Sequence, residues 1–511
     1  MSSDEERLAA ARASVEALRA SLAAREGPVR LVETHISWVL LTGTHAYKLK
    51  KPLRLPFLDF STLAARRHAC DEELRLNRRL APSLYLEVVE VRDGPLLDVA
   101  VKMRRFDDGA LWSERLAAGR LEAHHVDQLA QRLAGFHRDA AVASVESGYG
   151  SPAVHERVVG RLVDGIDAWH AGHPAAPGSS PWPAVRGWLL EQLHQLAPLF
   201  DMRRRGGRVR ECHGDLHLGN LVQLDDGATA FDGIDFDPEL RWIDVLDDIA
   251  FVAMDLMAHG RSGFAFRLLN AWLEASGDYD GLPALRFYLV ARALVRAQVV
   301  AIAETQGRPA APGLGTAEYL ALAHRLAHGR DARLAITHGL PGSGKSFVSG
   351  AMLEATAAIR VRSDVERKRL FGLGALESSR DRVAGGIYDA ASTARTYARL
   401  RTLARIALEA GWPVIVDAAF LRAAERADFA ELARELAVPF GIVDCSAPLA
   451  VLRERLAQRR ARGGDPSEAD ETVLDRLREA AEPLSDSERS TTLVAEPTRG
   501  IDPAFPNDAP R

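Results

Sequence analysis

The strongest chemical signal in this sequence is a glycine-rich phosphate loop. It matches G-x-x-x-x-G-K-[ST] completely, and an apolar run over 334–337 precedes it while a helix-forming run over 347–358 follows. Glycines let the backbone N–H groups turn toward a phosphate, and the following helix N-terminus adds positive potential. The sequence predicts a nucleotide-binding loop made of Gly339, Leu340, Pro341, Gly342, Ser343, Gly344, Lys345 and Ser346, with Phe347 next to it.

Two side chains of this loop have predicted roles in phosphoryl transfer. The Lys345 ammonium can reach the β- and γ-phosphates of ATP, and the Ser346 hydroxyl can bind Mg²⁺. The alternative is a glycine turn before a buried helix. That alternative does not account for the fixed positions of the motif together with both flanks, so ATP and Mg²⁺ are the expected cofactors.

A second group of polar residues lies well upstream, in Cys212-His-Gly-Asp-Leu-His-Leu-Gly-Asn220. Its pattern H-G-D-x-H-x-x-N stands where protein kinases have H-R-D-x-x-x-x-N. Asp215 can accept the proton of a substrate hydroxyl, and Asn220 can coordinate Mg²⁺. A second acidic metal ligand is expected on the return strand of the next hairpin. Asp232 and Asp235 both follow apolar residues there, and their spacing does not separate them.

The elements around this second group follow the order of a two-lobed kinase. An amphipathic helix over 4–25 comes first, and strands are expected next, at 29–41, 46–51, 85–92 and 96–103. A charged helix is expected over 71–80, between the second and third of these. Helical patterns then dominate, at 124–140, 154–169 and 183–200. Strands followed by helices favour an α+β arrangement.

Beyond the phosphate loop, strands and helices alternate, which predicts an α/β fold with a parallel sheet. Asp364 and Asp417 each end a predicted strand, and open α/β sheets bind ligands at that edge. A helix over 448–462 carries Arg455, Arg459 and Arg462 and leads into a Gly/Pro-rich loop over 463–468. Arginines in this position predict a lid that closes over the transferred phosphoryl group.

Residues 28–305 resemble the aminoglycoside phosphotransferase family, a branch of the kinase-like fold. The resemblance implies that Lys48 is the strand-three lysine, with Lys50 and Lys51 as rivals. It implies that the lysine's partner on the following helix is Glu73, with Glu72 next, and that His213 holds the catalytic loop. No glycine-rich loop precedes Lys48, and Thr42-Gly-Thr44 is the one candidate for that role.

Residues 332–496 resemble the small P-loop kinases, such as gluconate kinase, chloramphenicol phosphotransferase and the zeta toxins. The resemblance implies that Asp364 is the base for an acceptor hydroxyl, with Arg367 nearby, and that Asp417 is a metal- or water-positioning acid. It also suggests Arg422 and Arg426 as substrate contacts. Arg455 and Arg459 are expected to reach the nucleotide.

Composition narrows the remaining classes of function. A net charge of −5 over 511 residues gives no sign of nucleic-acid binding, and no run of 18 apolar residues predicts a membrane span. The three cysteines are far apart and form no C-x-x-C pair, which favours a reducing compartment. The acidic first residues do not resemble a signal peptide, so we expect a cytoplasmic protein.

The sequence thus predicts two nucleotide-binding halves. A kinase-like domain is expected over 1–315, with lobes at about 28–103 and 104–305, then a connecting helix over 316–331, a P-loop domain over 332–496 and a disordered tail over 497–511. The expected function is phosphate transfer from ATP to hydroxyls of small molecules at both sites. Alternatives are a nucleotide-sensing regulator, a degenerate first site, and a toxin-like P-loop kinase restrained by the upstream domain. The acidic stretch over 241–257 is either an electronegative wall or a helix whose Asp244 or Asp248 braces the catalytic loop.

Overall fold

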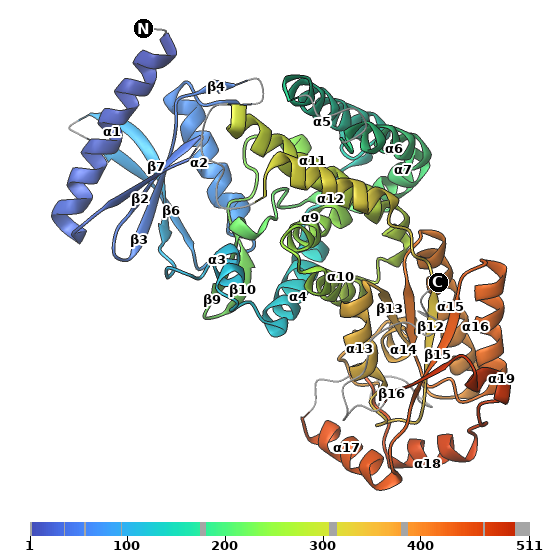
Figure 1. Ribbon diagram of the computed structural model, residues 1–511. Coiled ribbons are helices and arrows are strands. Elements are labelled where there is room, and N and C mark those ends of the chain that lie inside the picture. Colours follow the sequence, from blue (N-terminus) through green and yellow to red (C-terminus); the bar gives the residue numbers. More distant parts are fainter. Residues whose placement is uncertain are drawn as a thin grey trace. The chain divides into compact units, whose positions relative to one another are not determined.

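The computed structural model describes residues 3–34, 36–55, 58–92, 95–173, 180–305, 314–379, 387–462 and 466–495. The chain divides into two compact units (Figure 1): the first holds residues 1–162 and 193–255, and the second holds residues 163–192 and 256–511. The domain limits expected from the sequence remain a prediction. The tail over 497–511, and most of the Pro/Gly-rich stretch over 306–315, lie outside the described residues.

Five antiparallel strands form the main sheet of the first unit, in the order β1-β2-β3-β7-β6. The segment expected to be one strand over 29–41 is instead two, because the chain turns back at Thr34, whose hydroxyl accepts a hydrogen bond from the Ser37 N–H at 3.0 Å. The strands are β1 (Arg30–Glu33), β2 (Ser37–Leu41), β3 (His45–Lys50), β6 (Tyr85–Arg92) and β7 (Leu96–Arg104), with a separate short hairpin of β4 (Arg54–Leu55) and β5 (Leu58–Asp59).

The two faces of this sheet have different partners (Figure 1). Helix α1 (Ser3–Glu26) buries Val15, Leu18 and Leu22 against Tyr47 and Leu49 of β3 and their neighbours. Helix α2 (Leu63–Asn77) packs against β6 and β7, and it begins eight residues before the predicted start because the Thr62 hydroxyl caps it. Side chains alternate along a strand, so the lysines of β3 point away from α1 and toward α2.

The rest of the first unit is mainly helical and carries the predicted catalytic loop. Helix α4 packs against the hairpin that follows this loop. The elements are α3 (Trp112–Ala117), α4 (Ala123–Asp139), β8 (Val209–Glu211), β9 (Leu221–Leu224), β10 (Gly227–Ala230), α8 (Pro238–Arg241), β11 (Trp242–Asp244), α7 (Ala197–Arg205) and most of α5 (Pro152–Gly172) and α9 (Val245–Ala258).

The sheet of the second unit is parallel throughout, as the sequence predicts, and has the order β13-β14-β12-β15-β16. Its strands are β12 (Leu334–His338), β13 (Ile359–Arg362), β14 (Val414–Asp417), β15 (Phe440–Cys445) and β16 (Thr492–Ala495). The helices that accompany them are α13 (Lys345–Thr356), α14 (Ser363–Leu370), α15 (Ala390–Glu409), α16 (Ala423–Glu435), α17 (Leu449–Arg462), α18 (Glu471–Glu479) and α19 (Asp486–Arg489).

Helices from before the phosphate loop also belong to the second unit. They are α10 (Ser262–Ser276), α11 (Leu282–Thr305), α12 (Thr316–His328) and most of α6 (Trp182–Gln195). Helix α10 packs against α13 and β13, and α11 packs against α15 (Figure 1). Among the described residues, no helix is both long enough and apolar enough to cross a bilayer.

Candidate active sites

The first candidate site is a buried charge cluster between β3 and α2. The Lys48 ammonium donates to Glu73 Oε1 at 2.9 Å, and Lys50 Nζ lies 2.5 Å from Glu73 Oε2. Glu73 therefore serves two lysines that are two residues apart on one face of β3. Glu72 instead pairs with Arg75 at 2.8 Å, outside the cluster, so Glu73 is the acid that meets the strand-three lysine.

Electrostatics keeps the Lys48–Glu73 pair ionised. Burial alone would lower the pKa of Lys48, but the carboxylates of Asp232, Glu73 and Asp235 outweigh it and raise that pKa. Burial would likewise raise the pKa of Glu73, but Lys48 and Lys50 reverse the effect and lower it to about 2. An ionised lysine–glutamate pair of this kind is what positions nucleotide phosphates in kinases.

Two other sequence-based candidates lie away from this cluster. Lys51 Nζ is 2.7 Å from Glu33 Oε1, and it also donates to a backbone carbonyl of the β1–β2 turn. The turn at Thr42–Thr44 connects β2 to β3 at the opposite end of β3 from Lys50. Its Thr42 hydroxyl donates to Glu26 of α1 at 2.7 Å. This turn is tied to α1, and the expectation that it acts as a phosphate loop finds no support in the geometry.

The predicted base and metal ligand of the first site lie side by side. The Asn220 side-chain amide donates to both the backbone carbonyl and Oδ2 of Asp215, each at 3.0 Å. His217 Nε2 lies 3.5 Å from the same carboxylate oxygen. The Asp215 side chain is 34% exposed, so a substrate hydroxyl can reach it.

A buried aspartate holds the loop in this shape. Asp248 accepts hydrogen bonds from the backbone N–H groups of His213, at 3.1 Å, and Gly214, at 2.8 Å. Asp244 pairs instead with Arg203, at 2.6 Å, and both of these side chains are buried. Of the two interpretations of the acidic stretch, bracing of the loop by Asp248 is therefore the one that the structure bears out.

Exposure separates the two candidate metal aspartates. Asp232 lies two residues beyond the end of β10, has a φ of +62°, leaves 44% of its side chain exposed, and is paired with Lys48. The Asp235 side chain is only 5% exposed, and its carboxylate lies 2.5 Å from Lys50 Nζ. A metal arriving with a nucleotide can reach Asp232 far more easily, and Asp235 fits the role of a fixed counter-ion for Lys50.

The second candidate site begins at the phosphate loop, whose backbone needs its glycines. Gly339, Gly342 and Gly344 have φ values of +140°, +83° and +98°. A Cβ at Gly339 would collide with the Cys445 carbonyl oxygen, and one at Gly342 would lie 2.9 Å from a backbone oxygen. The Ser343 hydroxyl oxygen is buried and has no hydrogen-bond partner among the described residues. These features fit a cradle for an anionic phosphate.

The side chains at the end of this loop fit Mg²⁺ and phosphate. Lys345 Nζ donates to the Gly339 and Leu340 carbonyls at 2.8 and 2.9 Å, and burial lowers the pKa of Lys345. The Ser349 hydroxyl donates to Asp417 Oδ2 at 3.1 Å and to the Ser346 carbonyl at 3.3 Å. Ser349 thus contacts both the Ser346 backbone and the Asp417 carboxylate. The Ser346 hydroxyl and the Asp417 carboxylate are hard oxygen ligands of the kind that Mg²⁺ prefers.

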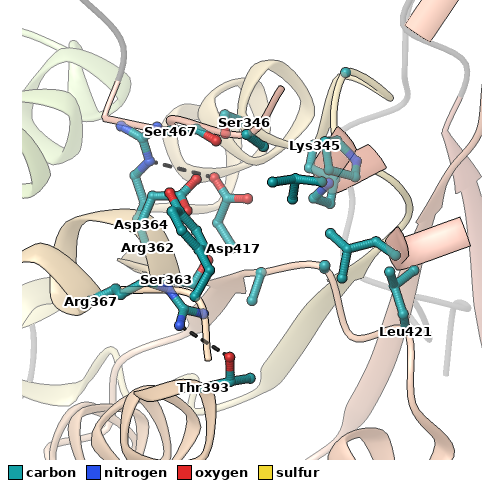
Figure 2. A pocket seen from close by; sticks show the side chains of 18 of the residues that line it. Lys345, Ser346, Arg362, Ser363, Asp364, Arg367, Thr393, Asp417, Leu421 and Ser467 are labelled. Atoms are coloured by element: carbon teal, nitrogen blue, oxygen red, sulfur yellow. Dashed lines mark hydrogen bonds and ion pairs between the residues drawn. The ribbon is translucent and has the colours of Figure 1, made fainter. Parts of the chain in front are cut away.

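A cavity of about 750 Å³ joins the phosphate loop to the predicted base (Figure 2). Lys345 and Ser346 line one part, and Asp364 and Asp417 line another. The volume lies within the range of small-molecule sites. The predicted site residues that line it are Pro341, Gly342, Gly344, Lys345, Ser346, Phe347, Asp364, Asp417, Arg455 and Arg459.

The predicted arginines fall into two groups. Arg455 donates to the Gly342 carbonyl at 3.2 Å and Arg459 to the Ala469 carbonyl at 2.8 Å, both from α17. Arg422 also lines the cavity. Arg426 does not: its side chain is buried and pairs with Glu488 at 2.6 Å, so the expectation that it contacts substrate is wrong. The loop glycines at 463–464 and the side chain of Arg462 lie outside what the structure describes.

Sequence reasoning missed several cavity-lining side chains. Arg362 is one, and its Nε lies 3.7 Å from Asp417 Oδ2 (Figure 2). It stands two residues before Asp364 at the end of a strand, which is a usable signal. Tyr388, Tyr397 and Arg476 also line the cavity, but they come from segments whose approach depends on tertiary packing and carry no local signal.

Comparison with known proteins gives one family match and several similar proteins. A family model described as an AAA domain matches residues 334–484. The proteins Rv2004c of Mycobacterium tuberculosis and Mb2027c of Mycobacterium bovis, both described as uncharacterized, are each 30% identical over 443 residues, covering 85% of this chain and 86% of the relative.

Solved structures are similar to each half. A choline kinase from Cryptosporidium parvum is similar over 61% of this chain and 94% of its own, with 11% identity and a TM-score of 0.40. A gluconokinase from Sinorhizobium meliloti is similar over 34% of this chain and 86% of its own, with 20% identity and a TM-score of 0.24.

The fold and the sites have the arrangement expected of a kinase-like part followed by a P-loop domain, and the AAA-domain model matches the P-loop part. The chain belongs to the family of Rv2004c and Mb2027c.

Proposed function

We propose that the P-loop domain transfers the γ-phosphoryl group of ATP to a hydroxyl of a small molecule. The observation that carries the proposal is the cavity, because it places the phosphate loop and the Asp364 carboxylate on the walls of one space. In the reaction, the acceptor oxygen forms a bond to the γ-phosphorus while the bond to the β–γ bridging oxygen breaks. The products are ADP and a phosphate monoester.

The residues of this chain have separate roles in that step. Asp364 accepts the proton of the acceptor hydroxyl, Lys345 binds the β- and γ-phosphates, and Arg459 faces the developing charge. Ser346 and Asp417 would hold Mg²⁺, which when bound neutralises phosphate charge. These assignments rest on the positions of the side chains around the cavity.

The acceptor side of the cavity favours an anionic molecule. Arg367 of α14 is buried, lies 5.1 Å from the centre of the Tyr388 ring, and donates hydrogen bonds to two neutral groups, the Ile387 carbonyl and the Thr393 hydroxyl. Its Nε has no hydrogen-bond partner among the described residues. A buried guanidinium in this setting is stabilised by an anion, so carboxylate- or phosphate-bearing alcohols are the first acceptors to test.

We also propose that the kinase-like site is a second phosphotransferase, with Asp215 as base and Asn220 and Asp232 as metal ligands. The paired Lys48 and Glu73 support it, because a degenerate site need not keep both partners. A nucleotide sensor without turnover is the competing function. It predicts that Asp215→Asn leaves every activity of the protein unchanged.

The test is a transfer assay with γ-labelled ATP against sugars, sugar acids, aminoglycosides and nucleosides. For an acceptor used by the P-loop site, Asp364→Asn is expected to lower turnover by about 10² or more while ATP binding is kept. Lys345→Ala should abolish the same transfer by removing ATP binding. Asp215→Asn is the matched control, since it changes the other site only. Unchanged turnover in Asp364→Asn would contradict the assignment of the base.

A further inference from the structure

Helix α10 covers the edge of the P-loop sheet, although it lies outside the residues matched by the AAA-domain model. The edge strand is β13, and edge strands leave backbone groups unpaired. The Asn270 side chain, which is 1% exposed, fills two of these places: its amide donates to the Ala358 carbonyl at 2.8 Å, and its oxygen accepts from the Arg360 N–H at 2.6 Å. Helix α10 therefore supplies hydrogen-bond partners to the backbone at this edge of the P-loop sheet.

One turn further along the same face of α10 is Glu274, and its carboxylate meets two arginines of β13. Arg360 Nη2 lies 2.7 Å from Glu274 Oε1, and Arg362 Nη1 lies 3.3 Å from Glu274 Oε2. All three side chains are only 13% exposed. At this burial an ion pair is weakly screened, so the Glu274 carboxylate helps to set the position of each arginine.

Both arginines also contact the region of the predicted metal ligands, Ser346 and Asp417. Arg360 Nη1 lies 3.4 Å from the Ser346 carbonyl and 3.4 Å from the Ser349 hydroxyl. Arg362 lines the cavity, and its Nε lies 3.7 Å from Asp417 Oδ2 (Figure 2). Arg362 thus stands between Glu274, on α10, and Asp417, at the end of β14.

We propose that Glu274 is a positioning residue for the P-loop site: it holds Arg362 away from full pairing with Asp417, so that Asp417 can bind Mg²⁺. The inference rests on the proposed function of that site. Two carboxylates share the Arg362 guanidinium, and the Glu274 contact is the shorter. Without the Glu274 charge, Arg362 closes onto Asp417 and competes with the metal, because the attraction of an ion pair grows as its separation falls.

The test uses the full chain with Lys48→Ala, which weakens nucleotide binding at the first site. ATP binding is measured by calorimetry at a series of free Mg²⁺ concentrations. Glu274→Gln is expected to raise the half-saturating Mg²⁺ concentration by about 10-fold or more, the usual effect of losing a residue that orients a metal ligand. ATP affinity in the absence of Mg²⁺ should not change. If Glu274 only stabilised the fold, the substitution would lower both the Mg²⁺ affinity and the ATP affinity measured without Mg²⁺.

Two further variants complete the test. Glu354→Gln removes the 2.6 Å ion pair of Arg267 with Glu354, which also joins α10 to α13 but does not involve the cavity-lining arginine, and it should leave the Mg²⁺ dependence unchanged. Glu274→Gln combined with Arg362→Gln removes the competing cation and should recover most of the lost Mg²⁺ affinity. This double variant also keeps the buried charge balanced if Glu274→Gln alone does not fold.

The outcomes separate the two proposals. If the parent shows no Mg²⁺-dependent ATP binding that Lys345→Ala removes, the proposed function of this site is wrong and the role of Glu274 falls with it. If the parent binds as expected but Glu274→Gln keeps the parent's Mg²⁺ dependence, only the role of Glu274 is overturned. It is overturned as well if Glu354→Gln produces the same shift, or if the double variant recovers nothing.

Discussion

At the scale of single residues, the first site is defined by a shared acid. One carboxylate oxygen of Glu73 pairs with Lys48 and the other with Lys50. Each lysine also has a second acidic partner, an aspartate, that the other lysine does not contact. Lys48 meets the exposed Asp232, and Lys50 meets the buried Asp235. One lysine therefore faces the reachable side of the site, whereas the other is enclosed by protein.

The two aspartates are expected to respond differently to the loss of charge. Asp232→Asn should weaken Mg²⁺-dependent ATP binding at the first site by about 10-fold or more, because it removes a metal ligand. Asp235→Asn should instead lower the free energy of unfolding by roughly 3–5 kcal/mol, because it leaves the buried Lys50 with one partner fewer.

Calorimetry in a Lys345→Ala background, which silences the second site, measures the binding. Urea denaturation measures the stability. The assignment is refuted if Asp235→Asn abolishes Mg²⁺ dependence while Asp232→Asn keeps it.

Residue types and spacing predict most of these side chains. Asp215 with Asn220, and Lys345 with Ser346, belong to motifs whose chemistry fixes the spacing, so a single sequence suffices to propose them. The choice between Asp232 and Asp235 could not be made in that way, because both follow an apolar residue of the same segment. Burial favours Asp232 as the metal ligand, and burial depends on the packing of β3 and α2 around the two aspartates.

At the scale of elements, α17 links the phosphate loop to the rim of the cavity. Arg455 donates to the carbonyl of Gly342 within the loop, whereas Arg459, four residues later, donates to the Ala469 carbonyl beyond the helix end. The two arginines share a helix face but hold different partners. Movement of this helix would change the loop and the cavity wall together.

Removal of each arginine should therefore have a different effect. Arg455→Ala should weaken ATP binding, because the loop loses a bond that holds its backbone. Arg459→Ala should leave ATP binding near normal and lower turnover of the P-loop site by about 10² or more. Arginines that face the transferred phosphoryl group contribute about 10³ or more to the rate. An exposed arginine with no such role would change turnover by almost nothing.

Steady-state rates with ATP and with the acceptor varied in turn distinguish these effects. Glu454→Ala, in the same helix but exposed, is the matched control. Near-normal turnover in Arg459→Ala would refute the predicted lid.

Helices and strands of the second unit were predictable because apolar runs alternate with amphipathic ones, and the parallel sheet is confirmed. The break of 29–41 into β1 and β2 was not, since the bonds that turn the chain there depend on a single polar side chain, the Thr34 hydroxyl, which meets the Ser37 backbone in an otherwise strand-like run. The contacts of α10 with β13 could not be predicted from the sequence either. Asn270 and Glu274 look like ordinary helix residues until β13 lies beside them.

At the scale of the whole molecule, the chain carries two separate candidate nucleotide sites, one in each compact unit. We therefore expect two equivalents of ATP per chain in the presence of Mg²⁺. Lys345→Ala should remove one and Lys48→Ala should weaken the other, because each lysine serves a different set of phosphates. Isothermal titration calorimetry gives the stoichiometry directly. A single equivalent in the wild type would contradict the proposal of two kinase sites.

The Asn270 bridge to the edge of β13 also bears on how such a chain can evolve. A gene fusion or recombination event that joined a new partner just before the phosphate loop would discard α10 and uncover the Ala358 carbonyl and the Arg360 N–H. Uncovered strand edges recruit other strands, so the product would tend to self-associate. An exchange upstream of α10, inside the helical part that the sequence predicts to belong to the kinase-like half, would keep this bridge intact.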